Sequence, residues 1–319
     1  MRVFSSDDLD RTLDFPTLID ELAEAMRGGF IAPHRHHHPI GRAGEPQATH
    51  LLMPAWTESA SRAGLYLGVK VVNVFPGNAA RALPTVTGLY VLQSGRTGET
   101  LAAIDGTRLT HWRTAAASAV AARHLTRADS KRLLIVGAGA LAPFMARAHA
   151  SVRRYNEVAV WNHRPEGARR LAMSLADAGL NAKPTEDLEA AVSEADVISC
   201  ATLATEPLIA GQWLRPGQHL DLVGAFNVSM READDEALRR AHIFIDTDAA
   251  LTEGGDVAAG ILGGVIDRSA VIANLPALCR GAPGRRTPDE ITLFKSVGAA
   301  IEDLAAAILV WRKSGGAEP

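Results

Sequence analysis

Residues 137–142 have the types and spacing of a dinucleotide-binding turn. Gly137, Gly139 and Ala142 form a G-x-G-x-x-A pattern directly after a short apolar run, in "LLIVGAGALA". In such turns the first glycine permits a tight bend, the second lets the backbone approach a pyrophosphate, and the third small residue lets helix and strand pack closely. The phosphates then lie at the N-terminus of the following helix. The alternative is a tight turn without a ligand, because the motif alone is a weak signal.

The next apolar strand ends in "VWNHRPEG", and this ending predicts which dinucleotide is bound. NAD sites commonly have Asp or Glu here to accept a hydrogen bond from the ribose 2′-hydroxyl. This chain has no carboxylate at that place to repel a 2′-phosphate, and Arg164 can pair with one. We therefore predict NADP, with NAD possible. In the alternative interpretation Arg164 is only a solvated residue at the start of a helix.

The predicted cofactor-binding residues form three groups along the chain. The first is the glycine-rich turn, the second follows the next strand, and the third lies at the ends of two later apolar strands. They are Gly137, Ala138, Gly139, Ala140, Leu141, Ala142, Asn162, His163, Arg164, Thr202, Val223, Gly224 and Ala225.

Two basic residues in the first part of the chain are candidates for binding a carboxylate. Lys70 interrupts the apolar run "LGVKVVNVF", and a lysine facing inward from a strand is costly without an anionic partner. Arg113 directly precedes a helix predicted to begin at residue 114, where free N–H groups and a guanidinium together suit a carboxylate. The residues alone leave both roles open, since Lys70 can equally point to solvent.

The stretch "PHRHHHPIG" has four histidines around Arg35. Neutral imidazoles ligate transition metals, so a metal site is chemically feasible. Neighbouring residues on an extended segment point to opposite faces, however, so the run does not form a compact three-ligand cage. We predict no metal site here.

Composition limits the class of protein. The 319 residues are 47% hydrophobic with a formal charge of −3, enough apolar material for two domains and too little charge to favour nucleic acid or an anionic membrane as partner. No apolar run approaches the roughly 20 residues that span a bilayer, and the N-terminus lacks the layout of a signal peptide. The two cysteines have no disulfide or zinc spacing. We expect a soluble, cytoplasmic protein.

The pattern of predicted elements changes near residue 130. Residues 50–110 contain short strands and turns, followed by an alanine-rich helix over 114–125 with Thr114 as its N-cap. From 131, short apolar strands alternate with amphipathic helices, which predicts an α/β fold with a parallel sheet. Residues 288–313 are predicted to be one long helix. We predict one domain over 1–125, completed by 290–319, and a dinucleotide-binding domain over 126–289.

Five motifs together resemble the ornithine cyclodeaminase/mu-crystallin family and extend over nearly the whole chain. They are "GVKVVNVFPGN", "LPTVTGLYVL", "LTHWRTAAASAVAARHL", "GAGALA" and "TLFKSVGAAIEDLAAA". The resemblance implies a Rossmann domain, a strand-rich domain for substrate binding and homodimer formation, and an active site between them. It further implies that Lys70, Thr85, Arg113 and Arg35 hold the α-carboxylate of a small amino or imino acid. One or two histidines near Arg35 would add hydrogen bonds or proton transfer.

Two positions depart from the cyclodeaminase pattern. Phe226 and Leu51 stand where the resemblance places an aspartate near the nicotinamide and a glutamate for the distal amine of ornithine. An ammonium without a counter-charge in an apolar pocket loses several kcal/mol. The stretch "VGAF…MRE" also resembles the reductase branch of the family. That resemblance implies reduction of 1-pyrroline-2-carboxylate or its six-membered homologue to proline or pipecolate, with Lys70, a histidine or water as proton donor. Ornithine cyclodeaminase and a mu-crystallin-like binder of small molecules are the alternatives.

Overall fold

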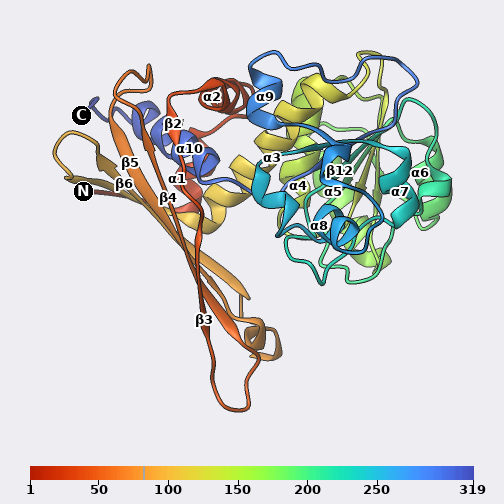
Figure 1. Cartoon of the computed structure of the whole chain (residues 1–319), viewed down its shortest axis with the longest axis horizontal. Coiled ribbons are helices and arrows are strands. Elements are labelled where there is room, and N and C mark those ends of the chain that lie inside the picture. Colours follow the sequence, from red (N-terminus) through yellow and green to blue (C-terminus); the bar gives the residue numbers. More distant parts are fainter. Residues whose placement is uncertain (82) are drawn as a thin grey trace. The chain divides into compact units, whose positions relative to one another are not determined.

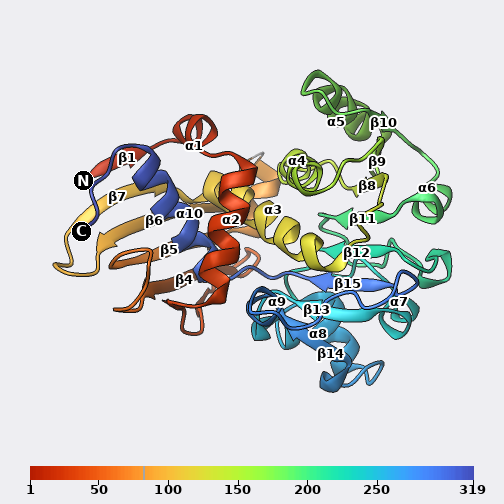
Figure 2. The same cartoon turned by 90° about the horizontal axis from the view of Figure 1, so that it is seen from above.

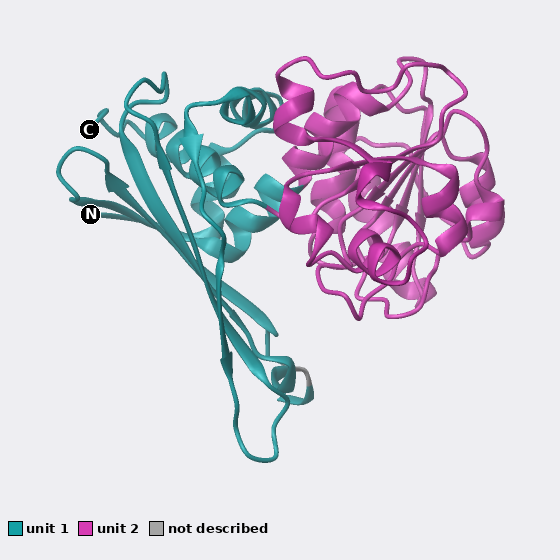
Figure 3. Cartoon of the chain, viewed as in Figure 1, with its two compact units in different colours: residues 1–114, 299–319 teal, residues 115–298 magenta. Residues whose placement is uncertain are grey.

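The computed structural model describes residues 1–81 and 83–319. The chain divides into two compact units (Figure 3), unit 1 with residues 1–114 and 299–319 and unit 2 with residues 115–298. The first junction lies inside helix α3 (Gly106–Leu125), and the second follows strand β15 (Thr292–Lys295). Among the described residues, no helix combines the length and apolar composition needed to cross a membrane.

Unit 1 consists of a seven-stranded sheet with helices on one face (Figures 1 and 2). The strand order is β1-β7-β6-β5-β4-β2, with β3 also paired to β4, and every pair except β1–β7 is antiparallel. The strands are β1 (Arg2–Phe4), β2 (Phe30–Ile31), β3 (His36–Ile40), β4 (Ala48–Thr57), β5 (Tyr66–Val74), β6 (Val86–Ser94) and β7 (Thr100–Asp105). The helices are α1 (Ser6–Thr12), α2 (Phe15–Arg27) and α10 (Ala300–Lys313), and η1 (Pro76–Arg81) is a 3₁₀ turn.

Strand alternation gives this sheet two different faces. Met53, Lys70, Tyr90 and Ile104 lie opposite one another on four neighbouring strands and are all buried on the face that packs against α10. Side chains on the other face are mostly only partly buried, and Leu89 is 46% exposed. Lys70 therefore points into the covered side of the sheet, which answers one question that the sequence left open.

Unit 2 is an eight-stranded, wholly parallel sheet between layers of helices (Figure 2). Its order is β10-β9-β8-β11-β12-β15-β13-β14, so the order reverses between β8 and β11. The other strands are β8 (Arg132–Val136), β9 (Glu157–Trp161), β10 (Ala182–Pro184), β11 (Val197–Cys200), β12 (His219–Leu222), β13 (His242–Ile245) and β14 (Val271–Asn274). The helices are α4 (Ala142–Val152), α5 (Pro165–Asp177), α6 (Leu188–Glu194), α7 (Asp235–Arg240), α8 (Gly255–Leu262) and α9 (Leu275–Cys279). The predicted α/β class is confirmed, and a reversal of strand order is where such sheets bind ligands.

Two predictions of local structure are wrong. Helix α3 begins at Gly106 rather than at 114, because Asp105 caps it by accepting a hydrogen bond from Arg108 N at 2.7 Å. The segment predicted as one long final helix contains strand β15, and its helix α10 begins only at Ala300. Short apolar runs do not distinguish strand from helix by periodicity alone, and pairing with β12 and β13 decided this one.

Candidate active site

The glycine-rich turn has the geometry that its sequence predicts. Gly137 has φ +107°, and a Cβ atom added there would lie 2.7 Å from the carbonyl oxygen of Ala201, so only glycine fits. At Gly139 an added Cβ would meet no atom within 4 Å, which leaves open space beside the backbone. Helix α4 begins at Ala142 with its cap at Leu141, directly after the turn. The turn lies at the carboxyl end of β8, next to the reversal of strand order, and fits a pyrophosphate.

Asn162 connects this turn to the next helix. Its Oδ1 accepts a hydrogen bond from Ala138 N at 3.1 Å, and its Nδ2 donates to Arg164 O at 2.8 Å. Both ends of the amide are thus engaged within the protein. His163 and Arg164 are exposed, and in the part of the chain that the structure describes neither side chain has a hydrogen-bond or ion-pair partner. The two side chains are accessible to a ligand at the end of β9.

Glu232 organises the loops that follow β11 and β12, and sequence reasoning missed it. Its buried carboxylate accepts hydrogen bonds from Thr202 N (2.7 Å), Thr202 Oγ1 (2.8 Å), Gly224 N (2.7 Å) and Ala225 N (3.3 Å). A Cβ on Gly224 would lie 2.0 Å from the carbonyl oxygen of Thr202, so the two loops are in direct contact. Burial raises the pKa of Glu232, while Lys295 and the bonds from Thr202 favour its ionised form. The predicted residues Thr202, Gly224 and Ala225 therefore form one rigid edge.

A second buried pair supports Glu232. Asp256 accepts hydrogen bonds from the backbone N–H groups of Glu232 (2.8 Å) and Ala233 (3.0 Å). Its other oxygen lies 3.1 Å from Nζ of Lys295, and both side chains are fully buried. The only signal in the sequence is a charged residue next to apolar or small residues in each of three separate stretches, "LFKS", "MREADD" and "GGDV".

In unit 1 the structure brings Lys70 and Arg113 to one buried carboxylate. Nζ of Lys70 lies 2.9 and 2.7 Å from the two oxygens of Asp303, and Nε of Arg113 lies 3.0 Å from Oδ1 of the same group. Nη1 of Arg113 also donates to Glu302 at 2.6 Å. Lys70 and Arg113 are only 2% and 5% exposed, so this is a cluster of two cations and two anions in the interior.

Burial and neighbouring charge change the acidity of Lys70. Its pKa falls to about 8, because burial disfavours the ammonium, the charge of Arg113 adds to that effect, and Asp303 only partly opposes it. Burial likewise raises the pKa of the neighbouring Tyr90. Lys70 thus changes its charge near physiological pH.

The predicted arrangement of Arg113 at the start of a helix is wrong. Arg113 lies inside α3, and its guanidinium meets carboxylates of α10 rather than free N–H groups. Sequence reasoning missed Glu302 and Asp303. These two adjacent acids lie in the first turn of an alanine-rich helix that packs on a sheet. Acids buried in such a place need cations as partners.

The other predicted substrate residues lie at different distances from Lys70. Arg35 immediately precedes β3, and the register of that strand places it opposite Met53, two strands or about 10 Å from Lys70. Leu51 pairs with Val72 and shares the covered face with Lys70. Thr85 is not brought to the cluster: its carbonyl oxygen accepts from Phe75 N, which is about 16 Å along β5 from Lys70. Phe226 follows the edge held by Glu232 and is 42% exposed.

The histidine run is divided between the two faces of the sheet. His36 and His38 share one face with His50, with ring centroids 6.5 and 6.4 Å apart, whereas His37 points to the other. His50 is bound through Nδ1 to Asn73 at 2.8 Å. Over residues 1–81 and 83–319, no group of three or more His, Cys, Asp or Glu side chains is arranged to hold a metal ion.

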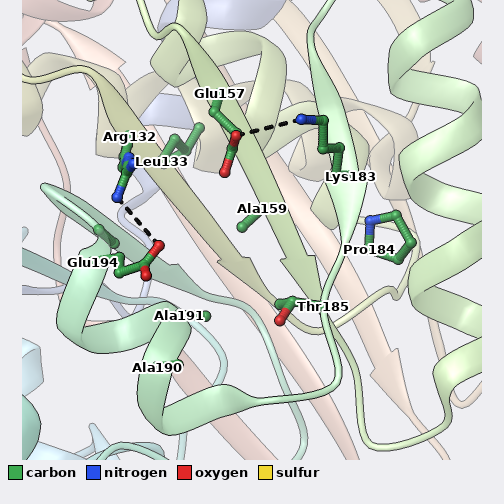
Figure 4. A pocket seen from close by; sticks show the side chains of 11 residues that line it. Arg132, Leu133, Glu157, Ala159, Lys183, Pro184, Thr185, Ala190, Ala191 and Glu194 are labelled. Atoms are coloured by element: carbon green, nitrogen blue, oxygen red, sulfur yellow. Dashed lines mark hydrogen bonds and ion pairs between the residues drawn. The ribbon is translucent and has the colours of Figure 1, made fainter.

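A separate cavity of about 280 Å³ lies over the first residues of β8 and β9 and against α6 (Figure 4). Two surface ion pairs border it, Arg132–Glu194 at 3.2 Å and Lys183–Glu157 at 3.7 Å, and its floor is formed by alanines. None of the predicted site residues lines this cavity. Its walls come from the start of β8, whereas the glycine-rich turn follows the end of that strand, so we do not assign the cavity to the active site.

Comparison with known protein families shows what this chain is similar to. The family model described as "Ornithine cyclodeaminase/mu-crystallin family" matches residues 15–317. The chain belongs to this family. The resemblance inferred from the five motifs is therefore confirmed, and it includes both the Lys70 and Arg113 motifs and the glycine-rich turn.

Members of the ornithine cyclodeaminase/mu-crystallin family resemble the chain over nearly its full length. The Delta(1)-pyrroline-2-carboxylate reductase of Paracoccus denitrificans is 40% identical, over 93% of this chain and 93% of that protein. The structure of the Thermococcus litoralis enzyme of the same name, in complex with NADH and L-proline, has a TM-score of 0.92 at 33% identity and covers 98% and 97% of the two chains. An archaeal alanine dehydrogenase dimer with bound NAD has a TM-score of 0.89 at 29% identity, over 98% and 96%.

Proposed function

We propose that the protein is an NAD(P)H-dependent reductase that converts a cyclic imino acid, 1-pyrroline-2-carboxylate or 1-piperideine-2-carboxylate, to L-proline or L-pipecolate. The buried pair of Lys70 and Arg113 carries the proposal, because two cations held at one point suit a small carboxylate. The reductases of Paracoccus and Thermococcus support it, since they match this chain end to end.

Different residues are proposed to hold the cofactor and the substrate. The open backbone at Gly139 and the start of α4 would hold the pyrophosphate, and Thr202, Gly224 and Ala225 would contact another part of the dinucleotide. When bound, the reduced nicotinamide supplies a hydride to the imine carbon. Lys70 and Arg113 bind the carboxylate and orient the ring, an effect worth several kcal/mol. Arg35 stays a candidate for the same carboxylate, whereas Thr85, about 16 Å along the sheet from Lys70, does not.

Two apolar residues at positions that the family resemblance places beside the substrate favour an imine over a diamine. Leu51 shares the covered face with Lys70, and Phe226 follows the loop of β12, so neither position offers an acid to the distal ammonium of ornithine. A cation placed among such side chains is poorly solvated. The absence of an acid at these two positions argues against the cyclodeaminase reaction in this member of the family.

The proposal is tested with purified protein and two substrate pairs. We expect NADPH to be oxidised, measured by its absorbance, when 1-pyrroline-2-carboxylate or 1-piperideine-2-carboxylate is added. We expect no ammonia from ornithine with NAD. Ammonia release from ornithine would instead establish the lyase, and tight binding of the imino acid without turnover would establish a binding protein.

We further propose that NADP is preferred, through Arg164. Replacing Arg164 with Asp should move the ratio of kcat/KM for NADPH over NADH toward NADH by roughly ten- to a hundredfold, about 1.4–2.8 kcal/mol, because a repelling charge replaces an attracting one. His163 can share the phosphate, which limits the shift. Arg169, which is also on this segment but is paired with Glu186 at 2.6 Å, provides the control substitution to Asp. An unchanged ratio of kcat/KM in the Arg164 variant would refute the role of Arg164 in NADP preference.

A homodimer is also proposed. The face of the unit 1 sheet opposite α10 carries exposed Trp56, Leu89 and Val3, at 40%, 46% and 72% exposure. Large exposed apolar side chains on one face of a sheet favour a protein contact, and the archaeal alanine dehydrogenase of similar structure is a dimer. The cytoplasmic location stays a prediction.

A further inference from the structure

We propose that Asp303 is the positioning residue that holds Lys70 and Arg113 in place for the substrate carboxylate and keeps Lys70 protonated. This inference rests on the proposed function and adds a residue that does not itself touch the substrate. Asp303 belongs to the last helix of the chain, far in sequence from both cations.

The geometry shows one carboxylate bridging two cations from different elements. Oδ1 of Asp303 accepts from Lys70 Nζ at 2.9 Å and from Arg113 Nε at 3.0 Å, and Oδ2 lies 2.7 Å from Lys70 Nζ. Lys70 comes from β5, Arg113 from α3 and Asp303 from the first turn of α10. Removing the bridge leaves two neighbouring positive charges without the group that both contact.

Glu302 has a narrower contact and serves as a comparison. It accepts from Nη1 of Arg113 at 2.6 Å, and its charge raises the pKa of Lys70 less than that of Asp303 does. Both acids lie in the first turn of α10, where the helix dipole favours negative charge. The two carboxylates therefore differ mainly in whether they touch Lys70.

Such a cluster is difficult to explain by stability alone. Buried ion pairs often contribute no more than apolar side chains of similar volume, because both charges lose their hydration. This interior contains four charged groups beside Tyr90 and Met53, where an apolar packing would be simpler. The four buried charges are explained if Lys70 and Arg113 bind a negatively charged ligand.

The groups around Lys70 determine when it is charged. Asp303 and Glu302 face it from α10, Arg113 and Thr110 from α3, and Tyr90 from β6. Burial and Arg113 lower the pKa of Lys70, and Asp303 raises it by charge and by hydrogen bonding, with the balance near 8. Without Asp303 the pKa of Lys70 falls further, so the amine becomes neutral at lower pH and loses its attraction for a carboxylate.

The test is the pH dependence of kcat/KM for 1-pyrroline-2-carboxylate in the full-length protein. In Asp303→Asn we expect the loss of activity on the alkaline side to move to lower pH by about one unit, and KM at pH 7 to rise ten- to a hundredfold. Dinucleotide affinity should be unchanged. Ionisation of the substrate is common to both proteins, so a difference between them reports the enzyme. Glu302→Gln is the matched control and should shift the alkaline limb much less.

Two further variants keep the proposal falsifiable. Asp303→Glu keeps the charge but displaces it by one methylene, so its alkaline limb should stay in place while KM rises. This variant decides the case if Asp303→Asn does not fold. Lys70→Arg in the Asp303→Asn background should abolish the shifted limb, because arginine stays charged. A wild-type alkaline limb in Asp303→Asn, or a wild-type KM in Asp303→Glu, would overturn the proposal.

A measurement that needs no enzymatic activity distinguishes failure of this inference from failure of the proposed function. If the wild-type protein reduces neither imino acid, the action of Asp303 on Lys70 is measured by NMR titration of ¹³C-labelled lysine in wild type and Asp303→Asn. The Lys70 signal is assigned by its loss in Lys70→Arg. A lower lysine pKa in Asp303→Asn supports the positioning role, and an unchanged one refutes it whatever the substrate is.

Discussion

Lys70→Met lowers kcat/KM for 1-pyrroline-2-carboxylate at least a hundredfold, the expected result if Lys70 binds the substrate carboxylate. A hundredfold loss corresponds to about 2.7 kcal/mol of transition-state stabilisation. The loss should appear in KM as well as in kcat, because the same contact binds and orients the ring. Steady-state kinetics at pH 7, where wild-type Lys70 is charged, measure the effect.

A loss of folding must be separated from this loss of binding. Lys70→Met leaves Asp303 and Glu302 buried with Arg113 as their remaining cation, and breaking a buried pair costs about 3–5 kcal/mol. In the double variant Lys70→Met with Asp303→Asn the unpaired charge is gone, so the free energy of unfolding should recover while activity stays low. Near-normal activity in Lys70→Met would refute the role of Lys70.

The second large effect is expected in a matched pair of glycine variants. Gly139→Ala should raise the dinucleotide Kd at least tenfold, because its methyl group fills the open space where the pyrophosphate approaches. The free protein should keep its stability within about 0.5 kcal/mol, since the added Cβ meets no atom within 4 Å. Dinucleotide titration and denaturant unfolding measure the two quantities.

Gly137→Ala is the comparison within the same turn. Its φ of +107° and the carbonyl oxygen of Ala201 at 2.7 Å make alanine strained there before any ligand binds. We expect the free energy of unfolding to fall by about 1–3 kcal/mol, the usual cost of such backbone strain. If Gly139→Ala destabilises the free protein as much as Gly137→Ala, or binds the dinucleotide normally, the assignment of the turn is wrong.

Much of unit 2 could be predicted from the sequence. Its strands are short apolar runs, and the run before Gly137 with the small residues after it specifies a local strand–turn–helix unit. Information of this kind lies within a few consecutive residues, so it does not depend on distant partners. The strand β15 was misassigned because its four residues take their conformation from neighbouring strands far away in sequence.

The charged cluster around Lys70 shows the opposite case. Lys70 and Arg113 were identified from the chain and its family motifs, but their anionic partners were not, since Asp303 lies 233 residues after Lys70. The same holds for Glu232, whose bonds to Thr202 span 30 residues. Which acid neutralises which buried cation depends on how helices and strands pack, and no local pattern encodes that pairing.

The sequence by itself determined the fold class, the glycine-rich turn and the family, because each depends on residue types in short, ordered motifs. Only the tertiary structure decided that Lys70 faces inward, that Arg113 lies within a helix, and that Thr85 is about 16 Å along the sheet from Lys70. Strand register and helix packing set these positions. A buried charge is stable only where a partner from another element meets it, and that meeting is a property of the folded chain.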